Sequence, residues 1–312
     1  MFDSLSIRLK IVLLSGLCLL GVVALIVGMN IYQTNQNDDL VSDSSSKMLT
    51  ASVQNLLQAK AAEQAVRVQK TFGESLTVIT ALADQIKDMR VMAAKRSLDA
   101  GALREELNQS LKTAFERNDK VLGIWLAFEP NGLDGKDSEF VNDAARQSNE
   151  AGRFATYWSR AAGSALNTIM VEEDMTKTTL SVSGTPYNSW YTCPRDNKRT
   201  CLLDPYADTV GGKEMLMTTI SVPLIVDGKA IGVVGVDIAL DALQAAAVDS
   251  QRDLFNNAGH MLIVSGSGVL GADSSDATRV GKKKSAIPSA PTARTCCNWS
   301  AAARRRFLNR AS

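Results

Sequence analysis

An apolar run at residues 11–31, IVLLSGLCLLGVVALIVGMNI, limits the fold of this chain more than any other feature. About 20 apolar residues in a helix span the ~30 Å hydrocarbon core of a membrane. We therefore predict a transmembrane helix over residues 11–32, in contact with membrane lipid, after a short segment, 1–10. Arg8 and Lys10 precede the helix and acidic and amide residues follow it, so the N-terminus is expected in the cytoplasm.

A cleaved signal peptide is the alternative interpretation of this run. The apolar region of such peptides is about 7–15 residues long, which is shorter than the run in this chain. We also find no convincing small-x-small cleavage pattern before Tyr32. A retained anchor is therefore the preferred interpretation, and it places the later residues outside the cytoplasm.

Residues 36–95 contain no proline and are rich in residues that favour helix. Their apolar residues recur at intervals of three and four, which is typical of one buried helix face: Phe72, Leu76, Ile79, Leu82, Ile86, Met89 and Met92. A helix over this range would be about 90 Å long, too long to pack within one small domain. We expect a stalk helix whose later half is covered by a domain, and a homodimer formed through it.

Asp99 is the predicted N-cap of a second helix, because its carboxylate can accept hydrogen bonds from the free N–H groups of the first turn. The expected buried face of that helix repeats every four residues: Leu103, Leu107, Leu111 and Phe115. A further helix is predicted over 241–255. Short runs of apolar and aromatic residues predict strands at 121–128, 154–159, 261–264 and 269–272.

Two turn signals, Gly211-Gly212 and Asp227-Gly228, punctuate the stretch from 190 to 240. Each lies between runs rich in Val, Ile, Thr and Met, which is typical of a β-hairpin. We therefore predict three antiparallel strands, at 206–210, 213–226 and 229–238.

The register of these strands decides which side chains share a face. Ideal pairing through two-residue turns would put Asp237 opposite Thr218, on the other face of the sheet from Tyr206 and Asp208. One pocket formed by all three side chains therefore requires a bulge in the middle strand, or a loop that differs by one residue. Pro223 cannot donate to a strand ladder, so we expect the irregularity near this residue.

Several function classes are disfavoured. The formal net charge of +1 gives no case for nucleic-acid binding. His260 is the single histidine, so a site with several histidine ligands is excluded and a catalytic histidine would have to be this one. No HExxH, P-loop or dinucleotide-binding glycine motif follows a strand-like run. We expect no enzyme activity, no metal and no cofactor.

Cys193 and Cys201 flank a polar segment, 194–200, whose composition indicates a loop. An oxidising compartment would allow a disulfide between them, which would contribute about 2–3 kcal/mol in the chain-entropy description. Two free thiols are the alternative, because the Cα separation decides whether the bond can form.

Aromatic residues concentrate where the three-stranded region begins: Tyr157, Trp158, Tyr187, Trp190, Tyr191 and Tyr206. Carboxylates are interleaved with them: Glu172, Glu173, Asp174, Asp204, Asp208 and Asp237. Ring faces attract a cation by ~0.5–2 kcal/mol each, and a carboxylate supplies the counter-charge, so this composition suits an ammonium group. The alternative is that the rings pack a small core and the acids lie on loops.

The order of these features resembles the double Cache domain, the sensor of bacterial methyl-accepting chemotaxis proteins and of some sensor kinases. The resemblance covers residues 36–281 and rests on four motifs: Trp190-Tyr191, Pro205-Tyr206-x-Asp208, Pro223 and Gly235-x-Asp237-x-x-Leu240. It implies an α+β fold with a PAS-like antiparallel sheet. The implied parts are a membrane-distal module at about 119–241 and an incomplete membrane-proximal module at 260–281, within a periplasmic sensor, 33–281, on the bacterial inner membrane.

The resemblance also implies a binding pocket under the sheet, in which acids hold the amino group of the ligand. Its implied ligand-binding residues are Tyr157, Trp158, Asp174, Trp190, Tyr191, Tyr206, Asp208 and Asp237. Family members that sense amino acids carry an arginine two residues before the Trp-Tyr pair, where this chain has Asn188. The implied ligand is therefore a small amine, such as a polyamine or a biogenic amine. Amino acids are the alternative, with Arg153 or Arg160 serving their carboxylate.

Residues 282–312 are basic, lack periodicity and are predicted to be a disordered tail. The segment resembles a shifted reading frame, and a functional basic tail is the alternative. We expect a truncated receptor, because the parts that complete such receptors do not follow. A membrane-anchored structural or interaction protein is the hypothesis from a different class.

Overall fold

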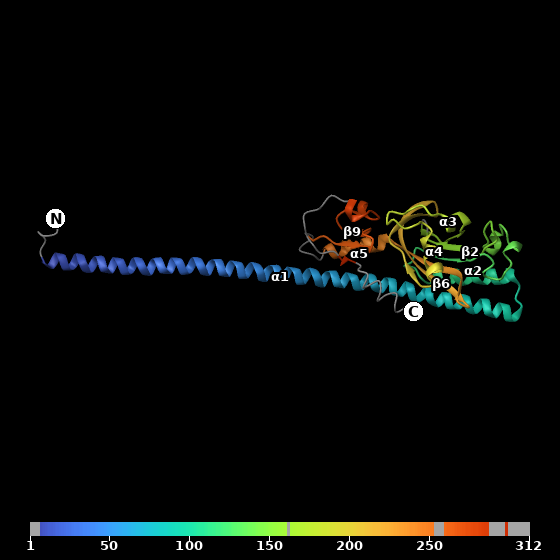
Figure 1. The fold of residues 1–312 in the computed structure, drawn as a ribbon, viewed down its shortest axis with the longest axis horizontal. Helices are drawn as coiled ribbons and strands as arrows, with labels where there is room; N and C mark the ends of the chain where they lie inside the picture. The colour runs from blue at the N-terminus through green and yellow to red at the C-terminus, as the bar shows by residue number, and fades with distance from the viewer. Residues whose placement is uncertain (1–6, 161–162, 253–258, 287–296, 299–312) are drawn as a thin grey trace. The chain divides into compact units, whose positions relative to one another are not determined.

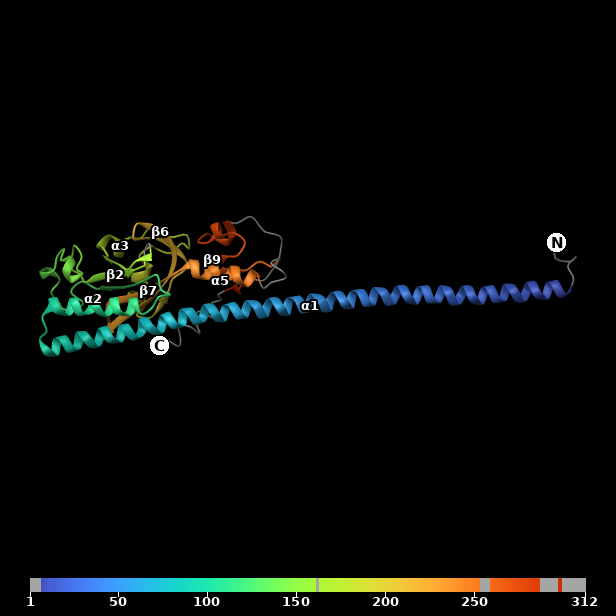
Figure 2. The ribbon, with the colours of Figure 1, turned by 180° about the vertical axis from the view of Figure 1, so that it is seen from behind.

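The computed structural model of the protein describes residues 7–160, 163–252, 259–286 and 297–298 (Figures 1 and 2). The chain divides into two compact units, residues 1–59 and residues 60–312. The predicted α+β class is confirmed, with a long helix followed by antiparallel strands and shorter helices. Helix α1, Ile7–Arg96, contributes to both units.

In the first unit, α1 carries the apolar run. Its segment Ile11–Thr34 is long and apolar enough to cross a membrane, and it is the one such helix among the described residues. Every side chain of this segment is exposed, which is how lipid-facing side chains of an isolated membrane helix would lie.

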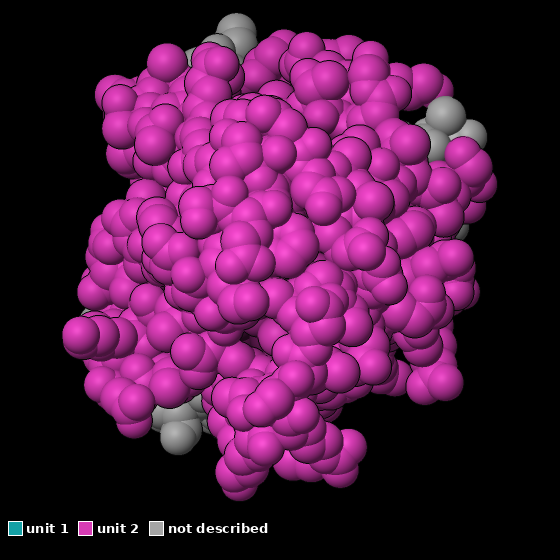
Figure 3. All heavy atoms as spheres, turned by 90° about the vertical axis from the view of Figure 1, so that its right-hand side faces the viewer, with its two compact units in different colours: residues 1–59 teal, residues 60–312 magenta. Residues whose placement is uncertain are grey.

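In the second unit, the later part of α1 packs through the predicted apolar face. Phe72, Ile79 and Ile86 are completely buried, whereas Met92 at the end of the stripe is exposed. Helix α2, Ala100–Glu116, follows, and Asp99 caps it as predicted, since its carboxylate accepts a hydrogen bond of 3.0 Å from the Ala102 amide. Figure 3 shows this unit from one end, with its side chains closely packed.

Seven described strands form one antiparallel sheet in the second unit. Along the sheet the order is β3-β2-β1-β7-β6-β4, and β5 also pairs with β6. The strands are β1 Gly123–Phe128, β2 Ala155–Ser159, β3 Leu166–Ile169, β4 Cys201–Leu202, β5 Tyr206–Val210, β6 Lys213–Val226 and β7 Lys229–Ala239. The three strands predicted around the two turn signals are thus confirmed within one residue.

An irregularity is present near Pro223, but its extra residue, Ile231, belongs to β7 and not to the middle strand β6 as predicted. The pairing of β6 with β7 shifts between Leu224 and Ile225, one residue beyond Pro223. Asp237 consequently lies opposite Thr219 rather than Thr218 as ideal pairing would have it. Because side chains alternate along a strand, this one-residue shift moves Asp237 to the other face of the sheet relative to β6.

The two faces of the sheet are covered by different helices. Trp158 in β2 lies on the face of α2, where its ring is 6.4 Å from that of Phe115. Its neighbour Tyr157 pairs with Trp125 of β1 on the opposite face. There the Trp125 ring meets the Trp190 ring edge-on at 4.8 Å. Trp190 belongs to helix α4, Ser189–Asn197.

Helix α4 replaces most of the polar loop predicted after Cys193. Burial of Trp190 and Tyr191 against the sheet outweighs the poor helix propensity of the following residues, Pro194 included. Cys193 and Cys201 form a disulfide, with their Cα atoms 6.2 Å apart, which joins α4 to β4.

The remaining elements form a smaller group after the sheet. Helix α5, Leu240–Arg252, leads to strands β8, Leu262–Val264, and β9, Leu270–Asp273, which pair as the predicted hairpin. A two-residue strand β10, Cys297–Asn298, pairs with β8. Most of the predicted tail, 287–296 and 299–312, lies outside the described residues. Its first residues are described: Lys282 accepts a backbone hydrogen bond from Leu270, and a 3-10 turn spans Lys284–Ala286.

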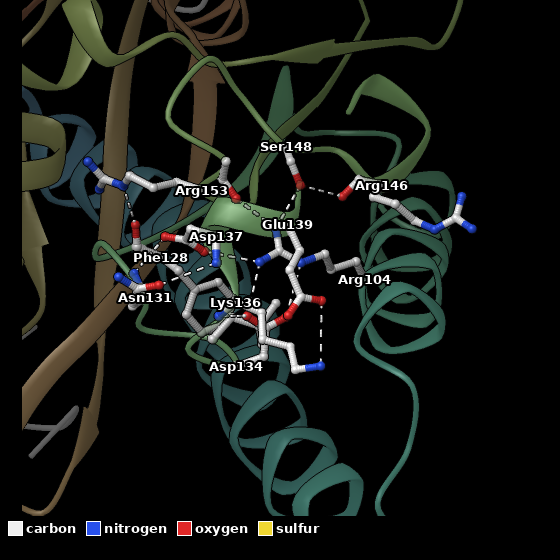
Figure 4. Close-up of polar contacts among 12 residues, drawn as sticks. Arg104, Phe128, Asn131, Asp134, Lys136, Asp137, Glu139, Arg146, Ser148 and Arg153 are labelled. Atoms are coloured by element: carbon white, nitrogen blue, oxygen red, sulfur yellow. Dashed lines mark hydrogen bonds and ion pairs between the residues drawn. The ribbon is translucent and has the colours of Figure 1, made fainter. Parts of the chain in front are cut away.

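A buried arginine connects α2 to the long segment between β1 and β2 (Figure 4). Arg104 is completely buried and makes a two-pronged ion pair with Asp134, both hydrogen bonds being 3.0 Å. The same guanidinium bonds Asp137 at 3.0 Å and Ser148 at 2.6 Å. The loop therefore depends on one cation for its internal order.

We predict that Arg104→Met lowers the melting temperature of the chain in detergent by on the order of 10 °C. Removing one partner of a buried ion pair costs about 3–5 kcal/mol, because the remaining carboxylates stay buried without a cation. Arg146→Met is the matched control, since the Arg146–Glu105 pair is half exposed and worth less than about 1 kcal/mol. Equal melting temperatures of the two variants would contradict the prediction.

Candidate ligand-binding site

The face of the sheet that packs on α4 gathers most of the predicted ligand-binding residues. We call this group the acidic–aromatic cluster, and it consists of Trp125, Tyr157, Asp174, Tyr187, Tyr206, Asp208 and Asp237. Its members come from β1, β2, β5, β7, helix α3 (Glu172–Thr176) and the segment before α4. The register shift between β6 and β7 places Asp237 on the same face as Tyr206 and Asp208.

Asp237 is the innermost acid of the cluster, with 4% of its surface exposed. One carboxylate oxygen accepts hydrogen bonds from the Thr219 hydroxyl at 2.6 Å and from the Trp125 indole at 3.3 Å. The Tyr206 hydroxyl lies 2.7 Å from the Thr219 hydroxyl and extends this chain of polar groups. Burial raises the pKa of Asp237 to about 6, against the opposing effect of these donors.

Asp208 lies further out and is half-buried. The Tyr187 hydroxyl donates to it at 2.8 Å, and the Thr209 amide donates to the same oxygen at 2.8 Å. Burial raises the pKa of Asp208, while both donors and the charge of Lys177 oppose this shift. Asp208 is thus a partly desolvated acid with neutral hydrogen-bond donors.

Asp174 is the third acid of the cluster and is supplied by α3. Burial raises its pKa first, and the charge of Asp208 raises it further. Among the described residues, none forms an ion pair with Asp174, Asp208 or Asp237 within 4 Å. The cluster therefore holds an excess of negative charge that burial makes unfavourable.

Two aromatic rings lie flat over glycines of neighbouring strands. A Cβ atom on Gly123 would lie 2.4 Å from a ring carbon of Tyr157, and one on Gly235 would lie 2.1 Å from a ring carbon of Trp125. The Tyr157 hydroxyl is buried close to the Asp237 carboxylate. Burial and the nearby charge of Asp237 raise the pKa of Tyr157, so its hydroxyl stays protonated and can donate.

Two predicted ligand-binding residues lie elsewhere. Trp158 faces α2, where its indole donates to Asn108 at 2.8 Å, because consecutive side chains of a strand point to opposite faces. The ring of Tyr191 packs against that of Trp190, 5.7 Å away, but its hydroxyl bonds Glu129 and Arg153, away from the three acids. Trp190 contributes to the cluster through its ring contact with Trp125.

Trp125, Tyr187 and Thr219 were not predicted to be site residues. Trp125 is 112 residues from Asp237 in the sequence, so pairing of β1 with β7 was needed to find it. Tyr187 was noted in the sequence as one of the clustered aromatic residues. In the structure it joins the acidic–aromatic cluster through its hydrogen bond to Asp208. Thr219 is a site residue because of the register shift.

The two arginines considered for a ligand carboxylate, Arg153 and Arg160, are already engaged. Arg153 forms an ion pair with Glu172 at 2.8 Å and donates to the Phe128 carbonyl at 2.9 Å. Arg160 donates to three backbone carbonyls at the end of α2 and just after it, at 2.8–2.9 Å. Asn188 is buried, and its amide donates to the Met175 carbonyl at 3.0 Å.

His260 lies in the smaller group after the sheet. Its Nε2 atom is 2.7 Å from Asp273 and 2.8 Å from the Ser275 hydroxyl. A catalytic triad requires the acid and the serine to contact different ring nitrogens. This arrangement therefore lacks the geometry of a nucleophilic centre.

This chain is similar to sensor domains of chemotaxis proteins. Residues 107–245 match the family of the methyl-accepting chemotaxis protein-like first PDC sensor domain. The methyl-accepting chemotaxis protein TlpQ of Pseudomonas aeruginosa PAO1 is 44% identical over 279 residues, which cover 89% of this chain and 39% of TlpQ. The chain thus spans less than half the length of this relative.

Two solved structures share the fold. One is called methyl-accepting chemotaxis protein X, with a TM-score of 0.56 and 24% identity over 74% of this chain and 78% of that one. The other is the periplasmic sensory domain of the Campylobacter jejuni chemoreceptor Tlp1, with a TM-score of 0.55 and 13% identity over 82% and 81%. Residues 107–245 therefore match a PDC, or Cache, sensor domain of the methyl-accepting chemotaxis protein type, the chain is similar to TlpQ, and the two structures share its fold.

Proposed function

We propose that this chain is the periplasmic ligand-binding part of a chemoreceptor anchored in the bacterial inner membrane, and that its ligand is a small amine. The observation that supports an amine is the presence of three carboxyl groups, Asp174, Asp208 and Asp237, beside aromatic rings and without an ion-pair partner among the described residues. An ammonium group would supply the counter-charge. A polyamine or a biogenic amine has this chemistry.

The energetics of the cluster favour a cation. Hydroxyl and indole donors stabilise Asp237 in part, yet its raised pKa shows that burial still disfavours the ionised form. An ammonium group would add charge-assisted hydrogen bonds to the carboxylates. Contacts with the ring faces would contribute a further ~0.5–2 kcal/mol each. Much of the binding energy would come from relief of the unfavourable charge in the free domain.

An amino acid is the weaker candidate ligand. Its carboxylate would need a cation, and a two-pronged arginine is the strongest such partner. Asn188 cannot supply one, and Arg153 and Arg160 are held by Glu172 and by backbone carbonyls, respectively. Replacing those contacts would leave buried acceptors without donors.

The remaining partners belong to the same proposal. Residues 11–32 would contact lipid, and α1 would form a homodimer with a second copy. A role in chemotaxis, without enzyme activity of the sensor itself, is inferred from the family of the matched segment.

We predict that Asp237→Asn weakens putrescine binding at least tenfold, because the innermost counter-charge is removed. Isothermal titration calorimetry of the chain in detergent measures this change. Asp227→Asn is the matched control, since it removes a carboxylate at the far end of the β6–β7 hairpin and Asn-Gly suits the same turn. Unchanged affinity of Asp237→Asn would move the site elsewhere.

We predict that the same Asp237→Asn variant melts at a higher temperature than the unliganded wild type at pH 8. The folded-state pKa of Asp237 is about 6, above its ordinary value of 3.8, so the fold favours the protonated form. Stability from this group is present below pH 3.8 and lost as pH rises through 6, by on the order of 1–3 kcal/mol. A lower melting temperature of the variant would contradict this account of the acid.

We predict that putrescine binds several-fold more weakly at pH 5 than at pH 8. The ligand stays doubly charged over this range, whereas Asp237 becomes protonated below about pH 6. A cation interacts more favourably with a carboxylate than with a carboxylic acid. The affinity for putrescine therefore decreases as the pH is lowered. Titrations at intermediate pH values should show the steepest change near pH 6, and a dissociation constant independent of pH would contradict the prediction.

A further inference from the structure

Lys177 places a positive charge beside the acidic–aromatic cluster of the free protein. It directly follows α3, and its ammonium lies 4.7 Å from the centre of the Tyr187 ring. The charge lowers the pKa of both Asp174 and Asp208. A cation over an aromatic ring, close to two carboxylates, has the same surroundings that an ammonium ligand would have.

The backbone at Lys177 is fixed, whereas its side chain is not. The Lys177 carbonyl accepts a hydrogen bond of 3.0 Å from the Asn188 amide, which holds the start of this loop against its end. The side chain is exposed, and its ammonium makes no ion pair within 4 Å with a described carboxylate. Its charge therefore stays available to the outer acids, on a flexible four-carbon stem.

We propose that Lys177 acts as an internal cation of the outer part of the site and determines how strongly the site prefers diamines to monoamines. This inference rests on the proposed amine-binding function. A single ammonium can bind at the buried Asp237 while Lys177 stays near Asp174 and Asp208. The second ammonium of a diamine meets the outer acids together with Lys177, and the two cations repel each other.

The size of this effect follows from the distance between the charges. Repulsion between two unit charges about 6 Å apart weakens binding by roughly threefold in bulk water and by more at the lower dielectric of a protein surface. Charges more than about 10 Å apart are largely screened by physiological salt. Removal of Lys177 should therefore strengthen the binding of a diamine about three- to tenfold and change that of a monoamine less than about twofold.

The test compares putrescine with n-butylamine, which has the same carbon chain and one ammonium fewer. Calorimetric titration of the chain in detergent gives both affinities for wild type, Lys177→Gln and Lys177→Arg, with competition against putrescine where butylamine binds weakly. Lys229→Gln is the matched control, because this exposed lysine lies eight residues from Asp237 along β7, about 26 Å away. The expected result is a selective gain for putrescine in Lys177→Gln, with Lys177→Arg and Lys229→Gln close to wild type.

Three results would overturn the inference. Affinities unchanged by Lys177→Gln, or raised equally for both amines, would show that Lys177 does not discriminate between them. An equal gain in putrescine affinity in Lys229→Gln would show that the net charge of the protein, and not the position of Lys177, controls binding. In each of these cases wild type still binds amines and the proposed function stands. If wild type binds neither amine, the proposed function itself fails and this inference with it.

Discussion

The pairing of β6 with β7 is the constraint on which the rest of the site depends. The shift between Leu224 and Ile225 places Asp237 opposite Thr219. The carboxylate then lies on the face that also carries Tyr206 and Asp208. Without the shift, the acid would point toward α2 and its apolar neighbours. A single extra residue in β7 therefore decides whether Asp237 joins Tyr206 and Asp208 on one face or lies on the opposite face.

Two groups of buried charged residues in this domain differ in the balance of acids and cations. Around Arg104, each of two carboxylates contacts the same guanidinium, so the network stabilises the loop that it holds. In the acidic–aromatic cluster the acids exceed the cations, and burial raises the pKa of Asp237 to about 6. The first arrangement is typical of structure, and the second is typical of a site that awaits a counter-charge. The unfavourable burial of negative charge thus occurs at the cluster where the ligand is proposed to bind.

Much of the fold could be predicted because its signals are local. The turn dipeptides, the cap at Asp99 and the apolar stripe of α1 each depend on neighbours a few residues apart, and the structure has them as expected. The bulge near Pro223 followed from requiring three side chains on one face. The candidate site was harder to predict, since alternation along a strand does not say which of Tyr157 and Trp158 lies on the face of the acidic–aromatic cluster. Trp125 joins the site through a strand pairing across more than a hundred residues, which no local pattern contains.

The glycines beneath the two rings have a consequence for how such a sensor can diversify. Gly123 and Gly235 leave no room for even one additional carbon, because the rings of Tyr157 and Trp125 occupy that space. Single substitutions at Gly123 and Gly235 are therefore expected to be poorly tolerated, since any larger residue would displace a ring. New ligand preferences are expected to arise at the exposed rim, in the loop that carries Lys177 and Tyr187. The sheet would be inherited nearly unchanged while that loop varies between descendants.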